Sequence, residues 1–540
     1  MRAWHSNTLL AIICAAPLVC AGHRARPAAS GTSRTLMSRQ AERAGALSVD
    51  DLRALLRSRF SRQPTLQRLL GAPVCGVRVY KFLYATVGGQ GEATDASGAL
   101  MIPTGPAAQC RGPRPILLYA HGTSLQRNAD MSAIRDPSNP QYLWSTDIAL
   151  VFAAHGDIVI APNYAGYDLS TLPYHPYFNA AQQSQDAIDS LTAGRQLLRQ
   201  VGRRVHGNGK LFVSGYSEGG FVAMATLRAL DSEHRPATAG APMSGPYARL
   251  AFTDEIFLGH PNPGRTVFMP MVLNSYAHLK VGSIDPTRIL SRKFRNASNL
   301  FPDKVGSAGL AKLVAAGEIP ASAVFQAEST GDGAPGFSPT HYPALAALPE
   351  GAPLHEAGFD PSKYLISTAY RAAYVADVDA HPDGGAPIDG SEPDLSTRVP
   401  EPPAEPGLLL RKDLKANDLR NYTPSMPLLM CGGVEDPIVF WDQNTAVMTA
   451  VLDSKVAAHP RLRFATLDLD VSGGADRAYV EHGLSPANNA ALESIARRLQ
   501  TAFTAYQHGV DASKGIHAYH YHTDEEPYCM LAARTFFEQY

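Results

Sequence analysis

Short apolar runs recur along the chain, and most of them are followed by a turn and then by a helical pattern. The runs at 115–120, 158–161 and 210–214 are apolar on both faces. This pattern is typical of parallel strands buried between helices. We therefore predict an α/β fold with a mostly parallel sheet flanked by helices. The expected strands lie at 77–86, 98–102, 115–120, 158–161, 210–214, 427–430 and 463–471.

The stretch from 248 to 424 lacks this alternation of apolar runs and helical patterns. It predicts a large helical cap inserted in the C-terminal half. It combines helical patterns with a Pro- and Gly-rich stretch at 381–407. The strand pattern returns after it, and two further helices are expected near 487–507 and 530–539. The helical patterns within the cap lie at 286–294, 310–316 and 362–378.

The chain before the first strand predicts a single helix. Ser48 is a suitable N-cap for a helix through Arg59, and Asp51 completes a pattern like a capping box. Residues 23–46 are rich in Arg, Ala and Ser, and we expect them to be poorly ordered. The expected organisation is a signal peptide at 1–22, an N-terminal segment at 23–70, core at 71–247, cap at 248–424 and core again at 425–540.

Composition and charge narrow the classes of partner. The chain has 540 residues, of which 45% are hydrophobic and 18% charged, and its formal net charge is −1. This balance is typical of a globular protein and argues against nucleic acid or an anionic membrane surface as a partner. The apolar run at 8–19 follows Arg2 and is too short to span a bilayer. We therefore expect a cleaved signal peptide and a secreted or periplasmic protein; an uncleaved membrane tether is the alternative.

The strongest chemical signal is the segment 215–220, which reads GYSEGG. A serine hydroxyl becomes a good nucleophile when a base takes its proton. In the G-x-S-x-G nucleophile elbow, the serine lies on a strained turn between a strand and a helix, and small neighbours avoid clashes. An apolar strand precedes this motif and a helical pattern follows it. The segment therefore predicts Ser217 as a nucleophile; a Gly-rich turn with a structural serine is the alternative.

An acyl-transfer site also needs hydrogen-bond donors for the oxyanion. We predict that the backbone N–H of Glu218, the residue after the nucleophile, is one of them. The other should come from the loop after an earlier strand, and Thr123 lies in such a loop, directly after 115–120. His121 in the same loop is expected to shape it rather than to act as a base.

In this fold the acid follows the serine along the chain. The strand at 427–430 leads into a glycine turn and then into Glu435 and Asp436, just before a proline. We predict Asp436 as the acid and retain Glu435 as its competitor. Both carboxylates could equally be solvated loop residues.

The base should come last in the chain, in the loop before the terminal helix. Three histidines lie there, at 517, 520 and 522. We favour His520, with His522 as the second choice and His482 as a more distant candidate. A metal site on the three histidines is disfavoured, because no cysteine or carboxylate pair at zinc-like spacing accompanies them. We therefore expect neither a metal nor a cofactor.

Four cysteines remain after the expected signal peptide, and an even number in an exported protein favours two disulfides. Three pairings are possible, and four buried thiols are the alternative. We favour Cys75–Cys110 and Cys431–Cys529. The second pair would tie the acid loop to the histidine loop. Catalytic side chains must be positioned accurately, and such a bond would restrict the movement of one loop relative to the other.

With these residues in place, the chain resembles the bacterial form of the secretory-lipase branch of the α/β hydrolases. The resemblance implies ester hydrolysis by a triad, here Ser217, Asp436 and His520, and a helical cap after a strand ending near Pro242. One departure is Glu218, since a neutral residue such as Gln is expected after the nucleophile; another is the crowding of three histidines at the base position. The matching segments are 115–124, 159–168, 175–190 (which contains HPYF), 210–220, 241–247, 428–440 and 518–537.

The predicted function is that of an exported serine carboxylic-ester hydrolase, an esterase or lipase that works through an acyl-enzyme. Its substrates would be small-molecule, lipid or polymer esters, and the cap would set the specificity. A serine peptidase of the same fold is one alternative, because a triad does not distinguish an ester from an amide. A polyester or aromatic-ester hydrolase and a non-catalytic binding protein are the others.

Overall fold

A computed structural model describes most of the chain from Leu36 onward. The expected signal peptide at 1–22 lies outside the described residues, as do residues 23–35 and 38–41 of the N-terminal segment. No helix among the described residues is long and apolar enough to cross a membrane. The described residues are 36–37, 42–279, 282–305, 309–327, 358–383, 401–402, 405–471, 478–511 and 517–540.

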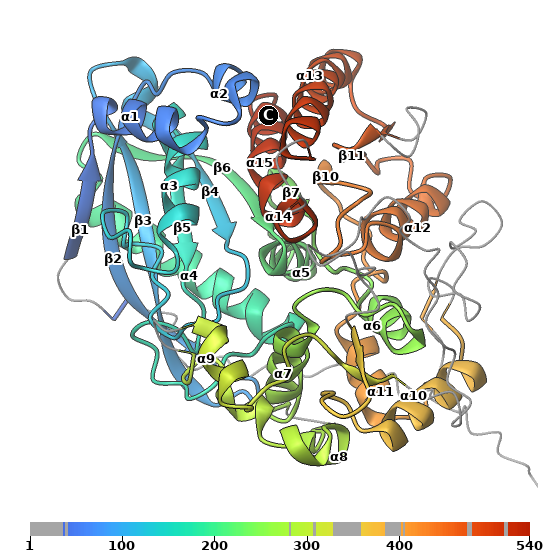
Figure 1. The fold of residues 1–540 in the computed structure, drawn as a ribbon. Coiled ribbons are helices and arrows are strands. Elements are labelled where there is room, and N and C mark those ends of the chain that lie inside the picture. The colour runs from blue at the N-terminus through green and yellow to red at the C-terminus, as the bar shows by residue number, and fades with distance from the viewer. Residues whose placement is uncertain are drawn as a thin grey trace, which may run out of the picture. The chain divides into compact units, whose positions relative to one another are not determined.

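A ten-stranded sheet forms the centre of the fold, in the order β1-β2-β3-β5-β4-β6-β7-β10-β11-β12 (Figure 1). The six strands from β5 to β11 run parallel, and β1, β2, β3 and β12 join at the edges by antiparallel pairing. The prediction of a mostly parallel sheet is confirmed. The strands are β1 (Glu42–Leu47), β2 (Gly76–Val87), β3 (Ala93–Thr104), β4 (Gly112–Ala120), β5 (Ile158–Pro162), β6 (Val205–Tyr216), β7 (Ala239–Met243), β10 (Leu428–Gly432), β11 (Phe464–Asp468) and β12 (Tyr479–His482).

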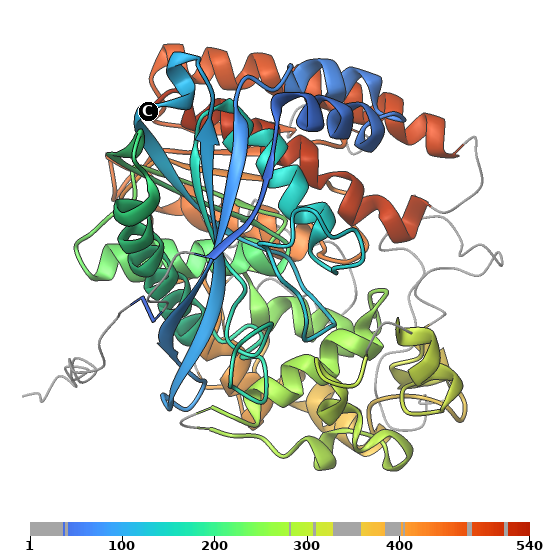
Figure 2. The ribbon, with the colours of Figure 1, turned by 90° about the vertical axis from the view of Figure 1, so that its left-hand side faces the viewer.

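Apolar side chains cover both faces of this sheet. Along β4, Ile116 and Leu118 join one buried cluster, while Leu117 and Tyr119 join the other. This follows from the strand geometry, since successive side chains point to opposite faces. Figure 2 shows the sheet between α4 on one side and α1, α13 and α15 on the other. The helices outside the cap are α1 (Val49–Arg59), α2 (Pro64–Leu70), α3 (Tyr142–Val151), α4 (Ala180–Val201), α5 (Glu218–Ser232), α12 (Val447–Lys455), α13 (Pro486–Asp511), α14 (His517–Asp524) and α15 (Glu526–Phe537).

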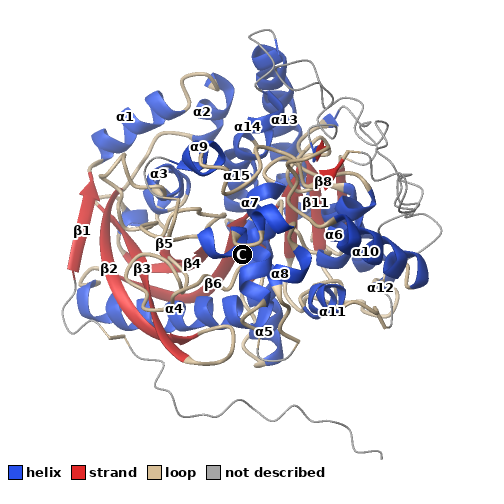
Figure 3. Cartoon of the chain, turned by 60° about the horizontal axis from the view of Figure 1, so that its bottom comes forward, coloured by secondary structure: helices blue, strands red, loops and turns tan. Residues whose placement is uncertain are grey.

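The described part of the segment between β7 and β10 contains helices and a separate two-stranded sheet, and it adds no strand to the central sheet. Figure 3 shows α7 and α8 in front of the strands when the lower side of Figure 1 is turned forward. The single helix expected at 286–294 is instead a short helix followed by a 3-10 turn at Arg292–Phe294. The elements of this cap are α6 (Arg249–Leu258), α7 (Arg265–Tyr276), α8 (Pro286–Ile289), α9 (Gly309–Ala315), β8 (Phe325–Gln326), β9 (Phe359–Asp360), α10 (Thr368–Ala380) and α11 (Leu409–Ala416).

Two strands at the edges of the sheet were not predicted. The strand β1 lies within the segment expected to be poorly ordered, and it pairs with β2 over five positions. The strand β12 pairs with β11. Both are short and lack a buried apolar pattern of their own. Their pairing depends on a distant neighbour, which is not visible in the local sequence.

Covalent and capping features agree with the sequence-based expectations. Cys75 is bonded to Cys110, and Cys431 to Cys529, with Cα atoms 5.5 and 5.6 Å apart. The second disulfide joins β10 to α15, so it fixes the start of the acid loop against the C-terminal helix. Ser48 caps α1 in a full capping box, in which its side chain and that of Asp51 each accept the other's backbone N–H.

Candidate active site

Ser217 lies on a sharp turn between β6 and α5. Its φ is 59° and its ψ is −122°, a left-handed conformation that a non-glycine residue adopts only under strain. A Cβ at Gly215 would clash with the Gly219 carbonyl, and a Cβ at Gly219 would clash with Ala120. The glycines of the motif are therefore required by close backbone approach, as the nucleophile elbow predicts.

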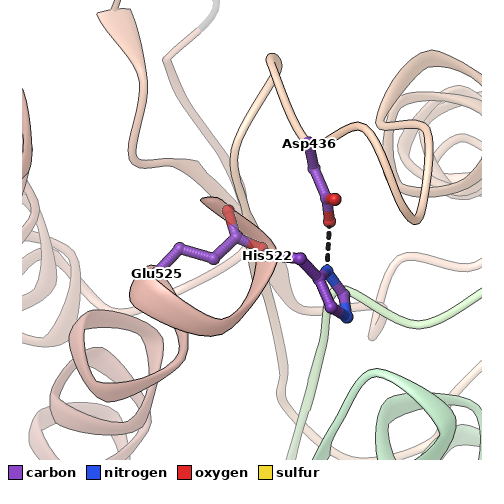
Figure 4. A group of neighbouring side chains, drawn as sticks. All are labelled: Asp436, His522 and Glu525. Carbon is purple, nitrogen blue, oxygen red and sulfur yellow. Dashed lines mark hydrogen bonds and ion pairs between the residues drawn. The ribbon is translucent and has the colours of Figure 1, made fainter. Parts of the chain in front are cut away.

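Asp436 and His522 form a buried pair at the carboxyl end of β10. Oδ1 of Asp436 accepts the N–H groups of Ile438 and Val439, at 2.8 and 3.2 Å. Oδ2 of Asp436 lies 2.6 Å from Nδ1 of His522 (Figure 4). The other ring nitrogen, Nε2, points away from Asp436 and is buried, and no described residue forms a hydrogen bond with it. A histidine held in this way presents a free nitrogen that can take a proton.

Tyr216 brings the serine turn next to this histidine. Its ring lies 4.9 Å from the His522 ring, and its hydroxyl is 3.3 Å from Nδ1. The same hydroxyl contacts the His522 carbonyl oxygen. Because Ser217 follows Tyr216 directly, the structure brings the predicted nucleophile, acid and a histidine to one edge of the sheet.

The preferred base, His520, is not the histidine that meets Asp436. His520 is exposed, whereas His522 is buried. The expected loop is in fact the helix α14, on which residues two apart point about 200° away from each other. Only one of the two side chains can therefore face the acid, and it is the second choice, His522. His482 pairs with Asp453 at 2.7 Å instead, and the side chain of His517 lies outside the described residues.

The two predicted oxyanion donors lie on either side of the serine turn. A Cβ placed on Gly122 would be 3.7 Å from Cβ of Ser217, so the loop that holds Thr123 contacts the turn. Among the described residues, neither the Thr123 N–H nor the Glu218 N–H has a hydrogen-bond acceptor. The Thr123 hydroxyl lies 2.9 Å from that of Tyr177. His121 is buried, with its ring nitrogens near the carbonyl oxygens of Gly122 and Asn163, which suits a role in shaping the loop.

Glu218, the unexpected carboxylate beside the nucleophile, belongs to a buried network. Its Oε1 lies 2.8 Å from Nε2 of His175 and 2.7 Å from Nε2 of Gln183. Nδ1 of His175 lies 2.9 Å from the Ala165 carbonyl oxygen, which can only accept. Nδ1 therefore has to hold a proton, and a further proton must lie between Nε2 and Glu218. The pair is neutral overall, and this accounts for a carboxyl group at that position.

The role of His175 was not predicted, although the sequence offered a signal for it. His175 begins the HPYF segment, one of the segments that carry the resemblance to the secretory-lipase branch. The unusual Glu218 and this histidine are 43 residues apart. Pairing them requires the fold, because it is the fold that brings the loop after β5 against the start of α5.

A second buried carboxyl group, Glu525, lies next to the Asp436–His522 pair. Its Oε1 is 2.6 Å from the Tyr216 hydroxyl and also contacts the Ser244 hydroxyl. Asp436, His522 and Glu525 have side-chain donor atoms within 4.8 Å of one another, the spacing of a metal site. Nδ1 of His522 and Oε1 of Glu525 have hydrogen-bond partners in the protein, whereas Oε2 of Glu525 and Nε2 of His522 have none among the described residues.

The environment of Glu525 predicts a pH-dependent stability. Burial, reinforced by the negative charge of Asp436, raises the pKa of the Glu525 carboxyl group well above its ordinary value of 4.5. The folded state therefore keeps a proton that the unfolded chain releases. This contribution to stability is present below the unfolded pKa and is lost as the pH rises toward the folded pKa.

We expect Glu525→Gln to escape that loss, because an amide does not titrate and can still accept from Tyr216. The difference in Tm between this variant and the wild type should widen in the variant's favour from about pH 5 to about pH 9. Calorimetry across this range measures the difference in Tm, with Glu493→Gln as the control, since Glu493 is a partly exposed carboxylate that pairs with Arg497 on the surface of α13. A difference that stayed constant or shrank with rising pH would contradict the assignment.

Comparison with known proteins identifies the fold. No protein-family model matches the chain, and no curated protein matches its sequence. Among solved structures, the rice cell wall degrading esterase LipA from Xanthomonas oryzae is similar, with a TM-score of 0.59 and 22% identity over 83% of this chain and 94% of that one. A presumed hydrolase from Legionella pneumophila is also similar, with a TM-score of 0.53 and 18% identity over 77% of this chain and 88% of that one. The chain therefore has the α/β-hydrolase fold, with a helical insertion between β7 and β10.

Proposed function

We propose that the protein is an exported serine carboxylic-ester hydrolase of the secretory-lipase-like kind. The observation that supports this most is the buried Asp436–His522 hydrogen bond, which leaves Nε2 of the histidine free beside the serine turn. A strained serine, a histidine and a buried aspartate are the three parts that a nucleophilic triad needs. The esterase LipA, which has the same fold, is consistent with this activity.

In the proposed reaction, Nε2 of His522 takes the proton of the Ser217 hydroxyl as Oγ attacks the ester carbonyl carbon. The backbone N–H groups of Thr123 and Glu218 stabilise the negative oxygen of the tetrahedral intermediate. His522 then gives its proton to the departing alcohol, and an acyl-enzyme remains on Ser217. Water attacks this acyl group in the second half, with His522 again acting as the base. Asp436 holds the ring and stabilises its positive charge.

Export is part of the proposal. Two disulfides suit an oxidising compartment outside the cytoplasm. The segment 1–22 has the pattern of a signal peptide and lies outside the described residues. We propose that it is removed and that the mature protein acts in the periplasm or outside the cell.

The experiment that tests the function uses the mature protein with two kinds of reagent. We expect a fluorophosphonate probe to label Ser217, identified by peptide mass spectrometry, and p-nitrophenyl esters from acetate to palmitate to be hydrolysed. The corresponding p-nitroanilides should be cleaved at least about a hundredfold more slowly, which separates an esterase from a peptidase. A folded protein that neither reacts with the probe nor cleaves any ester would overturn the proposal in favour of a binding role.

A further inference from the structure

Two arginines in the cap are buried without a carboxylate partner among the described residues. Arg249 begins α6 and is fully buried, and Arg265 begins α7 and is 2% exposed. Within the part of the chain that the structure describes, no group meets the hydrogen-bond geometry with the three guanidinium nitrogens of Arg249 or with Nε and Nη2 of Arg265. The neutral Tyr276 hydroxyl interacts with Arg249 but carries no counter-charge. A buried cation without a counter-charge lowers the stability of the folded protein, so such a pair is seldom kept without a use.

Two other buried arginines of the cap form ion pairs with aspartates, as expected of arginines with a structural role. Arg411 is buried and bonded to Asp254 at 2.7 Å. Arg420 is buried and bonded to Asp383, also at 2.7 Å. The two acidic residues of α6 are both engaged elsewhere, since Asp254 serves Arg411 and Glu255 contacts His260. Among its described residues, the cap therefore provides carboxylates for its structural arginines and none for Arg249 and Arg265.

The faces of both guanidinium groups are covered by aromatic rings. The Arg249 guanidinium carbon lies 4.0 Å from the centre of the Phe178 ring, and that of Arg265 lies 5.0 Å from the centre of the Phe252 ring. Stacking of this kind uses the flat face of the group and leaves the N–H donors at its edge. These donors are the part of an arginine that grips a carboxylate through two parallel hydrogen bonds.

Contacts lead from the arginine pair to both sides of the candidate active site. The Phe178 ring lies 4.0 Å from the Tyr177 ring, and the Tyr177 hydroxyl is 2.9 Å from that of Thr123, a predicted oxyanion donor. On the other side, the Phe252 ring lies 5.2 Å from that of Phe440, in the loop that follows Asp436. In Figure 1, α6 and α7 lie below α5, the helix that begins just after the serine.

The two positive charges influence each other. Burial lowers the pKa of Arg265 to about 9, and the charge of Arg249 adds to this effect. Arg265 therefore still holds its proton near neutral pH. No carboxylate among the described residues forms an ion pair with either arginine. A net positive charge is therefore left in this part of the cap.

We propose that Arg249 and Arg265 form a subsite for a carboxylate carried by the ester substrate. The proposal rests on the proposed function, because it assigns a substrate class to the same site: esters whose acyl part ends in a carboxylate. The two oxygens of a carboxylate match the fork of a guanidinium and supply the missing charge. Substrate binding would then remove the cost of the unpaired cations, which gives a gain in affinity for acidic over neutral esters.

The kinetic test compares mono-4-nitrophenyl adipate with its neutral methyl ester. The two substrates share the reacting ester and differ in one remote charge. We expect the ratio of kcat/KM values, acidic over neutral, to fall by about tenfold or more in Arg249→Met and in Arg265→Met, mainly through KM. Arg249→Gln repeats the test with a polar side chain, in case the methionine variant does not fold. An unchanged ratio in the folded variants would overturn the subsite.

Arg371→Met is the matched control. Arg371 is buried in the same cap and lies 4.5 Å over the Phe325 ring, yet its Nε donates to the Phe257 carbonyl at 3.1 Å. Its loss should lower the Tm and leave the ratio within about twofold of the wild type. Arg249→Met and Arg265→Met should not lower the Tm of the free protein in this way, because they remove an unpaired buried charge.

A binding experiment separates the subsite from the catalytic proposal. In Ser217→Ala, which cannot turn the ester over, we expect calorimetric titration with monomethyl adipate to show binding at least about tenfold tighter than with dimethyl adipate. Arg249→Met in the same background should abolish that preference. If the wild type cleaves no ester but this preference is seen, only the proposed function falls. If neutral esters are cleaved and no preference exists, only the subsite falls.

Discussion

Ser217→Ala is expected to reduce kcat/KM for p-nitrophenyl butyrate by about 10⁵-fold, down to the level that the remaining site can supply. The hydroxyl is the atom that forms the acyl-enzyme, so no other side chain can replace it. Folding should be unaffected. The backbone N–H of Ser217 still donates to the Met243 carbonyl at 3.0 Å, and alanine at this position keeps the same backbone strain.

The control for this variant is a serine at the other end of α5, the helix that begins after Ser217. Ser232 lies at the far end of α5, where its exposed hydroxyl donates to the Ala229 carbonyl. Ser232→Ala should retain activity within about twofold of the wild type. Rates that fell equally in both variants, or Ser217→Ala with near-native turnover and a native Tm, would remove Ser217 from the mechanism.

The central strands and the nucleophile turn could be predicted because their signals are local. A run such as 115–120 is apolar on both faces, and this pattern results directly from burial between two helical layers. The glycines at 215, 219 and 220 mark positions where no Cβ fits. Each of these inferences needs only a few neighbouring residues.

The choice between His520 and His522 could not be made from the sequence, because it depends on the conformation of the segment. In a loop either side chain could have turned toward Asp436. In the helix α14, which packs against α13 and α15, the direction of each side chain is set by its position in the turn. The sequence narrows the base to neighbouring histidines of one segment. It does not show which of their side chains points toward Asp436.

Glu218 and the cap arginines illustrate a further limit. In the sequence alone, a carboxylate next to the nucleophile has no explanation. In the structure, Glu218 is hydrogen-bonded to His175 and Gln183. Arg249 and Arg265 showed no signal in the sequence, because an arginine is notable only when it is buried and its acid is missing. Such features depend on which distant residues meet and which do not. They come from the tertiary structure, and they bear on specificity more than on the class of reaction.

The second large effect concerns the base. We expect His522→Ala to lower kcat/KM by about 10⁵-fold, because the Ser217 proton then has no acceptor and Asp436 has no partner for its Oδ2. The adjacent histidine offers a matched control on the same helix. His520 is exposed, and His520→Ala should change the rate by less than about twofold.

Chemical rescue adds a readout that a structural role would not affect. Added imidazole should restore part of the rate lost in His522→Ala, because the cavity left by the side chain adjoins the Ser217 turn. If His520→Ala were instead the inactive variant and His522→Ala retained near-native activity, α14 would have to rotate during catalysis. The buried Asp436–His522 bond would then belong to a resting state, and the base assignment would return to His520.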